Sequence, residues 1–289
     1  MTERFPEEMV IHTRHLRLGA KRWRVAGGLP ALGLHGWLDN ANTFDRLAPL
    51  LPKVDLVSLD LPGHGKSDHR PAGMRYHYTD FVDDVMAAAD TLGWERFLLL
   101  GHSLGAGIGC LAASAYPDRV ERLILIESLG PITGASEAVS DRLRRSVEAM
   151  KSRPSKKTAA CHDLAVLIRA RAAAGHLKRD AAEILVQRSV ERNGDGYRWR
   201  SDPRLKHPFP HCFSNDVVVA FLAGIASPVL LITAADGSLR KRAYFRSRCR
   251  AIANLSPVTL AGHHHLHIDN PLPVANALQT YLSESQTDL

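Results

Sequence analysis

The chain has 289 residues, of which 45% are hydrophobic, and it carries a formal net charge of +7. This length suffices for one large α/β domain with an insertion. The first thirty residues contain neither an apolar signal core nor a spanning run, so we expect no membrane span and a cytoplasmic location. The four cysteines are scattered without a CxxC pair, which predicts reduced thiols rather than a disulfide framework or a zinc site.

The basic excess is concentrated in the middle of the chain. Residues 134–216 hold 17 Lys and Arg against 10 Asp and Glu, whereas the rest of the chain is balanced at 20 of each. This region lacks the aromatic-basic interleaving and the motif spacing of nucleic-acid binders, so we expect no nucleic-acid partner. Its basic side chains either solvate helices or attract anionic substrates. The candidates for the second role are Arg142, Arg144, Arg145, Lys156 and Lys157.

Residues 9–25 alternate loosely and predict a hairpin that turns at residues 19–21. Short apolar runs then alternate with helical-period stretches, which is typical of buried parallel strands joined by crossover helices. The expected strands are 31–34, 54–59, 97–100, 123–126 and 229–232, and the clearest helices are 80–92 and 108–115. The pattern predicts an α/β fold with a mostly parallel central sheet flanked by helices. Ligands of such sheets bind at the carboxyl ends of the strands.

Residues 131–225, called the cap segment below, contain no strand-like run and are rich in Ala, Arg and Leu. A plain loop of this length is uncommon in a compact domain. We therefore expect a helical cap, or lid, with helices near 140–150, 158–174 and 179–192. It would be inserted into a core formed by residues 1–130 and 226–289.

The strongest chemical motif is Gly-His-Ser-Leu-Gly at residues 101–105, between the apolar run 97–100 and a helix of small residues. A G-x-S-x-G sequence in this context lifts the Ser103 hydroxyl clear of the backbone at a helix N-terminus, which favours developing negative charge. Serine attacks only when a base removes its proton. The histidines at 263–267 are candidates for that base. Neighbouring histidines diverge along an extended turn, which argues against a zinc site built from His263–His265.

These motifs resemble the α/β-hydrolase fold family, and within it the lipase- and esterase-like branch that includes the serine hydrolase-like proteins. The resemblance covers nearly the whole core. It rests on residues 34–37 (Leu-His-Gly-Trp), 60–67 (Asp-Leu-Pro-Gly-His-Gly-Lys-Ser), 101–105 and 262–271. It implies that Ser103 is the nucleophile and that His264, three residues before His267 and seven before Pro271, is the general base. His263 occupies a position that is usually small, so His263 and His265 remain alternative bases.

The resemblance also implies the remaining catalytic groups. The family's acid usually follows the next-to-last core strand, where Asp236 is the only carboxylate of the turn. Glu127, at the end of the run 123–126, is the alternative acid and ranks second. The oxyanion hole is assigned to the backbone N–H groups of Trp37 and Leu104. The other histidines of these motifs, His35, His64 and His102, are expected to support turns rather than transfer protons.

The activity that the resemblance implies is hydrolysis of a carboxylic ester or thioester of a small molecule through an acyl-enzyme, without a cofactor or a metal. A serine nucleophile disfavours the epoxide hydrolases and haloalkane dehalogenases of this fold, which attack with aspartate. Carbon–carbon bond hydrolases and cofactor-free haloperoxidases share the triad and remain alternatives, as does a non-catalytic small-molecule receptor. Neither the substrate nor the oligomeric state follows from the fold.

Overall fold

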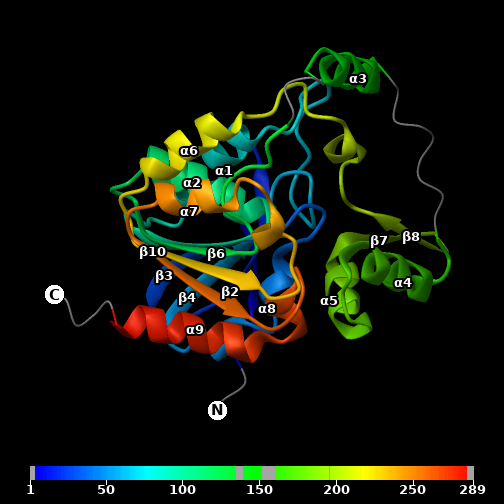
Figure 1. Ribbon diagram of the computed structural model, residues 1–289. Helices are drawn as coiled ribbons and strands as arrows, with labels where there is room; N and C mark the ends of the chain where they lie inside the picture. Colours follow the sequence, from blue (N-terminus) through cyan, green and yellow to red (C-terminus); the bar gives the residue numbers. More distant parts are fainter. Residues whose placement is uncertain (1–3, 135–138, 152–160, 195, 285–289) are drawn as a thin grey trace.

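The computed structural model describes residues 4–134, 139–151, 161–194 and 196–284. In this part of the chain, eight strands form one sheet in the order β1-β2-β4-β3-β5-β6-β9-β10 (Figure 1). From β4 to β10 every neighbouring pair is parallel, whereas β1–β2 and β2–β4 are antiparallel. The predicted α/β class with a mostly parallel sheet is confirmed. The strands are β1 (Glu7–His12), β2 (Arg17–Trp23), β3 (Leu29–Leu34), β4 (Val54–Leu59), β5 (Phe97–His102), β6 (Val120–Ile126), β9 (Val229–Ala234) and β10 (Leu255–Leu260).

Helices cover both faces of the sheet. One face carries α1 (Tyr78–Thr91), α2 (Leu104–Ala115), α6 (Asn215–Ala223) and α7 (Phe245–Ala251), and the other carries α9 (Pro271–Glu284) (Figure 1). The shorter helices are η1 (Ala41–Phe44), η2 (Ala48–Leu50), η5 (Leu239–Lys241) and α8 (Leu266–Asp269).

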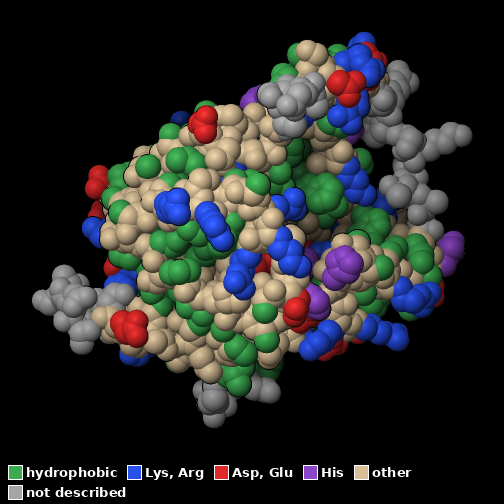
Figure 2. All heavy atoms as spheres, viewed as in Figure 1, with side chains coloured by type: hydrophobic (Ala, Val, Ile, Leu, Met, Phe, Trp, Pro, Cys, Tyr) green, Lys and Arg blue, Asp and Glu red, His purple; other side chains and the backbone are tan. Residues whose placement is uncertain are grey.

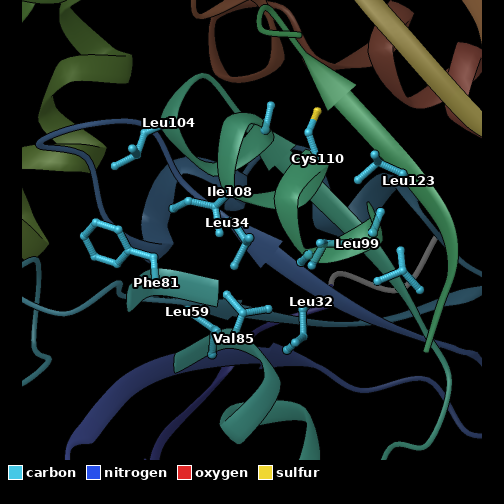
Figure 3. Packing of buried hydrophobic residues seen from close by; sticks show 14 of the residues in the cluster. Leu32, Leu34, Leu59, Phe81, Val85, Leu99, Leu104, Ile108, Cys110 and Leu123 are labelled. Atoms are coloured by element: carbon cyan, nitrogen blue, oxygen red, sulfur yellow. The ribbon is translucent and has the colours of Figure 1, made fainter. Parts of the chain in front are cut away.

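The central strands are apolar at successive positions because both of their faces are covered. In β5, Leu99 packs into the hydrophobic cluster under α1 and α2, and Leu98 packs into the cluster on the opposite face. Figure 3 shows Phe81 and Val85 of α1 and Ile108 of α2 in the first cluster. Burying a side chain of this size contributes about 1.5–3 kcal/mol, so the two clusters fix the positions of the strand ends.

The first hairpin turns earlier than the sequence predicted. The chain reverses between Thr13 and Leu16, where the Thr13 backbone N–H and hydroxyl both donate to the Leu16 carbonyl oxygen at 3.0 and 2.8 Å. Gly19 lies inside β2 instead, and a Cβ there would come within 2.8 Å of a carboxylate oxygen of Asp60. Glycine is needed at position 19 because the backbone passes close to Asp60, not because the chain turns there. The prediction of a turn at residues 19–21 was wrong.

The cap segment contains α3 (Val139–Lys151), α4 (Leu164–Gly175), α5 (Arg179–Ser189) and η4 (Pro203–Lys206). In Figure 1, α3 projects away from the rest, while α4 and α5 lie beside the sheet. The predicted third helix ends at Ser189 because β7 (Val190–Asn193) pairs with β8 (Gly196–Trp199). The expectation of a strand-free cap segment was wrong at this hairpin. Helix α6, near the end of the segment, packs with the core through Val218 and Leu222.

The basic residues proposed to attract anions are partly paired. Arg144 and Arg145 form ion pairs with Asp141 at 2.5 and 3.0 Å on α3. Figure 2 shows basic and acidic side chains side by side on this projecting helix. Lys156 and Lys157 lie outside the described residues. The described part of α3 therefore has the mixed charge of a solvated surface.

Helix α5 is fixed to the core by buried polar groups. Arg188 Nε lies 3.0 and 2.9 Å from the two carboxylate oxygens of Asp60, and its Nη1 donates to Glu8 at 2.7 Å. The Asn40 amide donates to the Leu185 carbonyl oxygen at 2.8 Å. Arg188 and Asp60 are both buried, so each charge depends on the other for compensation.

A second buried arginine holds the two ends of the cap segment. Arg248 of α7 donates from Nη1 to the carbonyl oxygens of Leu129 and Pro131 at 2.8 and 2.9 Å, where the chain leaves the sheet. Its Nε donates to Asn215 Oδ1 at 3.1 Å, where the chain returns in α6. The guanidinium also lies over the Tyr244 ring, 3.8 Å from its centroid. One side chain thus ties the exit and the return of the segment together.

Candidate active site

Ser103 occupies the sharp turn between β5 and α2. Its φ of 51° and ψ of −108° are strained for a residue with a side chain. The flanking glycines are required by packing, since a Cβ on Gly105 would lie 2.2 Å from the Leu34 carbonyl oxygen and one on Gly101 would lie 2.5 Å from the Ala106 nitrogen. The turn is pinned to the next strand because the Ser103 N–H donates to the Ile126 carbonyl oxygen at 3.0 Å. The side chain is half-buried at the helix N-terminus.

Residues with a strained, positive-φ backbone cluster around Ser103. Of the four described non-glycine residues with positive φ, three follow the carboxyl ends of adjacent strands. They are Leu38 after β3, Ser103 after β5 and Glu127 after β6, and the fourth, His176, ends helix α4. Strain of this kind costs about 1–3 kcal/mol per residue and concentrates at functional sites. Its location agrees with the general rule that such sheets bind ligands at their carboxyl ends.

Glu127 is the carboxylate that contacts His264. Its Oε2 lies 3.3 Å from His264 Nδ1, and its Oε1 accepts the backbone N–H of Ala234 at 2.6 Å. The Glu127 side chain is fully buried, whereas that of His264 is 38% exposed. A carboxylate held in this way fixes the imidazole with its proton on Nδ1, which leaves Nε2 free to accept a proton.

The two candidate acids differ in their contact with His264. Asp236 is exposed, and in the described structure no hydrogen bond or ion pair joins it to His264. Its backbone N–H donates to the Gly262 carbonyl oxygen at 3.0 Å, so the turn after β9 carries the side chain outward. The next residue, Gly237, makes room for the rival acid, since a Cβ there would lie 2.5 Å from Glu127 Oε2.

The remaining histidines of the C-terminal motif separate as the sequence implied. His263 is exposed, whereas His265 and His267 are buried. His267 Nε2 lies 2.8 Å from the Thr43 hydroxyl, and burial holds the pKa of His267 well below its usual range. These contacts anchor the turn that presents His264.

His102 connects the nucleophile's strand to the base. It directly precedes Ser103, and its Nε2 lies 2.9 Å from the His264 carbonyl oxygen, with ring centroids 4.8 Å apart. Burial lowers the pKa of His102 to about 3, so the ring is neutral. Within the described residues no hydrogen bond joins Ser103 to His264. Catalytic hydrogen bonds of this kind are often long in ligand-free structures.

The two expected oxyanion donors lie in the turns at the carboxyl ends of β3 and β5. Leu104, directly after Ser103, is the first residue of α2, and Trp37 lies in the turn after β3. Among the described residues, neither backbone N–H is paired with an acceptor of the chain. The Trp37 side chain is half-exposed, and its Nε1 donates to the Leu205 carbonyl oxygen of η4 at 3.3 Å. The indole thus lies between the oxyanion turn and the cap segment.

The turn at residues 60–67 supports the site without entering it. His35 Nε2 accepts the Leu61 N–H at 2.9 Å, and Asp60 accepts the N–H groups of Ala41 and Lys66 at 2.7 and 2.8 Å. His64 is buried against His35, with ring centroids 4.8 Å apart. Burial lowers the pKa of His64 to about 3, which matches the structural role expected for it.

A cavity of about 220 Å³ lies between the turn after β3 and the cap segment. Leu38 and Asp39 line one side, and Arg171 of α4 and Trp199 of β8 line the other. Asp39 and Arg171 carry no motif that would identify them from the sequence, because they are 132 positions apart in the chain. They form a buried ion pair. Burial alone would raise the pKa of Asp39, but the Arg171 guanidinium and His265 hold it well below its usual range.

The chain is similar to known proteins over most of its length, in sequence and in structure. Residues 32–271 match the model of a family described as alpha/beta hydrolase fold. A serine hydrolase-like protein of Dictyostelium discoideum is 31% identical, over 97% of this chain and 82% of that protein. A crystal structure of a hypothetical protein from Pseudomonas aeruginosa PAO1 superposes with a TM-score of 0.91 at 37% identity, covering 96% of this chain and 99% of that one.

A thioesterase domain from the curacin biosynthetic pathway shares the fold, with a TM-score of 0.85 at 24% identity, over 96% of this chain and 99% of that domain. No helix among the described residues is both long enough and apolar enough to cross a bilayer.

Proposed function

Because the chain belongs to the α/β-hydrolase fold family and resembles its serine hydrolase-like members, we propose that it hydrolyses a carboxylic ester or thioester of a small molecule through an acyl-enzyme on Ser103. The observation that carries this proposal is the buried contact between Glu127 and His264 beside a strained serine elbow. Structural roles alone do not require strain at three adjacent strand ends.

The proposed acylation step begins when Ser103 Oγ attacks the substrate carbonyl carbon and His264 Nε2 takes the hydroxyl proton. Glu127 holds the proton on Nδ1 of His264 and stabilises the imidazolium that forms. The carbonyl π electrons move onto oxygen, where the N–H groups of Trp37 and Leu104 stabilise the charge together with the α2 N-terminus. The bond to the leaving alkoxide or thiolate then breaks, and that group takes the proton from His264.

Deacylation reverses the roles. Water attacks the acyl carbon as His264 takes one of its protons. His264 then gives that proton to Ser103 Oγ as the bond between Oγ and the acyl carbon breaks and the carboxylic acid leaves.

The test uses the full chain and its Ser103→Ala variant. We expect a fluorophosphonate to label the unaltered protein and not the variant, and a series of p-nitrophenyl esters and thioesters of increasing acyl length to be hydrolysed only by the former. Undiminished labelling of Ser103→Ala overturns the assignment of the nucleophile. Labelling without turnover of any ester or thioester overturns the proposed substrate class and favours carbon–carbon bond hydrolysis, haloperoxidase-like chemistry or a receptor.

A further inference from the structure

A second group of ligating side chains lies behind the proposed catalytic pair. Asp39 lies in the turn after β3, His102 is the last residue of β5, and His265 follows β10. One ligating atom from each lies within 4.8 Å of the other two. All three residues are buried, with 2%, 0% and 6% of their surfaces exposed. The proposed ester hydrolysis uses none of their side chains to transfer protons.

Contacts with backbone carbonyl oxygens determine which nitrogen of the His102 and His265 rings faces Asp39. The Nε2 of His102 lies 2.9 Å from the His264 carbonyl oxygen and must be the protonated nitrogen, because a carbonyl oxygen only accepts. That contact leaves Nδ1 as the His102 ring nitrogen that faces Asp39. His265 Nδ1 donates to the Gly175 carbonyl oxygen at 3.1 Å, which leaves Nε2 as the His265 ring nitrogen that faces Asp39.

The two remaining ring nitrogens converge on Asp39 Oδ2. Asp39 Oδ2 lies 3.7 Å from His102 Nδ1 and 3.3 Å from His265 Nε2. Among the described side chains, both Asp39 Oδ2 and His102 Nδ1 are buried without a hydrogen-bond partner. Gly36 leaves the adjoining space open, since a Cβ there would lie 2.8 Å from the former atom and 2.9 Å from the latter. A buried acceptor without a partner is unfavourable, and a cation bound between these two atoms would satisfy both.

The donor set and the spacing suit a divalent transition metal. Two imidazole nitrogens and a carboxylate oxygen are ligands that Zn²⁺ prefers, and tetrahedral bonds of about 2.0–2.2 Å place neighbouring ligand atoms about 3.3 Å apart. Two of the three pairs here are at 3.3 and 3.7 Å. We propose that Asp39, His102 and His265 form a binding site for Zn²⁺ or a similar transition-metal cation, distinct from the ester-hydrolysing groups.

Arg171 competes with the metal for this site. Its Nη2 pairs with Asp39 and lies 3.4 Å from His265 Nε2, so one guanidinium neutralises the carboxylate and occupies the space beside a second proposed ligand. The metal must displace it. Arg171 and Asp39 both line the 220 Å³ cavity, which gives the cation a route and the guanidinium a place to go. Metal affinity is therefore limited by a cap-segment residue that is not itself a ligand.

The test measures Zn²⁺ binding to the metal-stripped full chain by competition with a chromophoric chelator, and follows Co²⁺ by its visible absorption. We expect one bound cation, and an intense tetrahedral Co²⁺ spectrum. His265→Gln and Asp39→Asn should each weaken binding by more than about tenfold. The matched control is His263→Gln, which alters the exposed neighbour and should leave the affinity unchanged.

Arg171→Gln distinguishes this proposal from a merely structural cluster, because it should tighten Zn²⁺ binding by removing the competing charge. Affinity that is unchanged or weaker in Arg171→Gln overturns the proposal. So does binding that survives intact in both His265→Gln and Asp39→Asn, or that is lost equally in His263→Gln. Circular dichroism confirms that each variant is folded, and the Co²⁺ spectrum of the unaltered protein tests the ligand geometry even where a variant fails to fold.

Discussion

Replacing Glu127 with glutamine changes one atom and should still stop the proposed chemistry. The N–H of Ala234 donates to Glu127 Oε1 at 2.6 Å, and a backbone N–H cannot accept. In the Glu127→Gln variant the amide oxygen must therefore stay on that side, which turns the amide NH₂ group toward His264 Nδ1. The imidazole then has to accept on Nδ1 and carry its proton on Nε2, the atom that is proposed to deprotonate Ser103.

The expected magnitude follows from this tautomer reversal. The equivalent Asp→Asn change in a serine protease lowers kcat by about 10⁴, or about 5 kcal/mol at 1.36 kcal/mol per factor of ten. Glu127 is 3% exposed, so water cannot take over its role, and we expect a loss of about 10³–10⁴. Asp236→Asn is the matched control, and because Asp236 is exposed it should stay within about threefold of the unaltered protein.

The assay is kcat/KM on the best ester found with the unaltered protein, together with the rate of fluorophosphonate labelling. Labelling requires the same activated serine and does not depend on the choice of ester. A loss of more than a hundredfold in Asp236→Asn, with Glu127→Gln near the unaltered rate, would refute the reasoning and restore Asp236 as the acid.

Three further predictions follow from buried contacts. Gly237→Ala should lower kcat/KM at least about tenfold, because its Cβ would lie 2.5 Å from Glu127 Oε2 and displace that carboxylate. Arg188→Met should lower the free energy of unfolding in urea by about 3–5 kcal/mol, because it leaves the Asp60 charge buried without its partner. His64 has its pKa lowered to about 3, so the unfolded chain binds one proton more between about pH 3 and 6.5, and stability falls as the pH falls. The stability lost between pH 7.5 and 5 should be about 2 kcal/mol smaller in His64→Gln.

Each of these has a control or a contradicting outcome. Gly224→Ala also brings a Cβ close to a side chain, within 2.8 Å of Ser114 Oγ, but outside the site, and should keep its activity. Arg179→Met alters an exposed arginine on the same helix as Arg188 and should change stability by less than about 0.5 kcal/mol. Equal pH dependence in the His64 variant and the unaltered protein would show that the buried ring is not kept neutral.

The sequence predicted the features that depend on local chemistry. The serine elbow has a recognisable motif because only glycine fits on either side of it, where a Cβ would come within 2.2 and 2.5 Å of backbone atoms. The supporting roles of His35 and His64 could be predicted because their turns also have a recognisable pattern. The β7–β8 hairpin was missed because four-residue strands leave too short an alternation to detect beside a helical pattern.

Which of the two candidate carboxylates contacts His264 depends on strand register, which the sequence does not reveal. Glu127 and Asp236 follow adjacent parallel strands whose carboxyl ends meet. Ile126 pairs with Ile232, so Glu127 stands level with Thr233 and its long side chain lies against the end of β9. Asp236 lies beyond a further turn and faces solvent. The available signal was Gly237, whose missing side chain marks the space that the Glu127 carboxylate fills.

Arg248 holds the two ends of the cap segment next to each other, as if they were pinned. Because one guanidinium holds both Leu129 and Asn215, the excursion between them is a closed loop whose closure entropy has little dependence on its length. Glu127 lies between β6 and Leu129, where Arg248 contacts the chain, and so belongs to the core side of that contact. The cap helices also contact the site directly, through Arg171 on Asp39 and through the Gly175 carbonyl oxygen on His265. An exchanged cap must therefore keep these contacts, besides the pinned ends, if His264 is to keep its place.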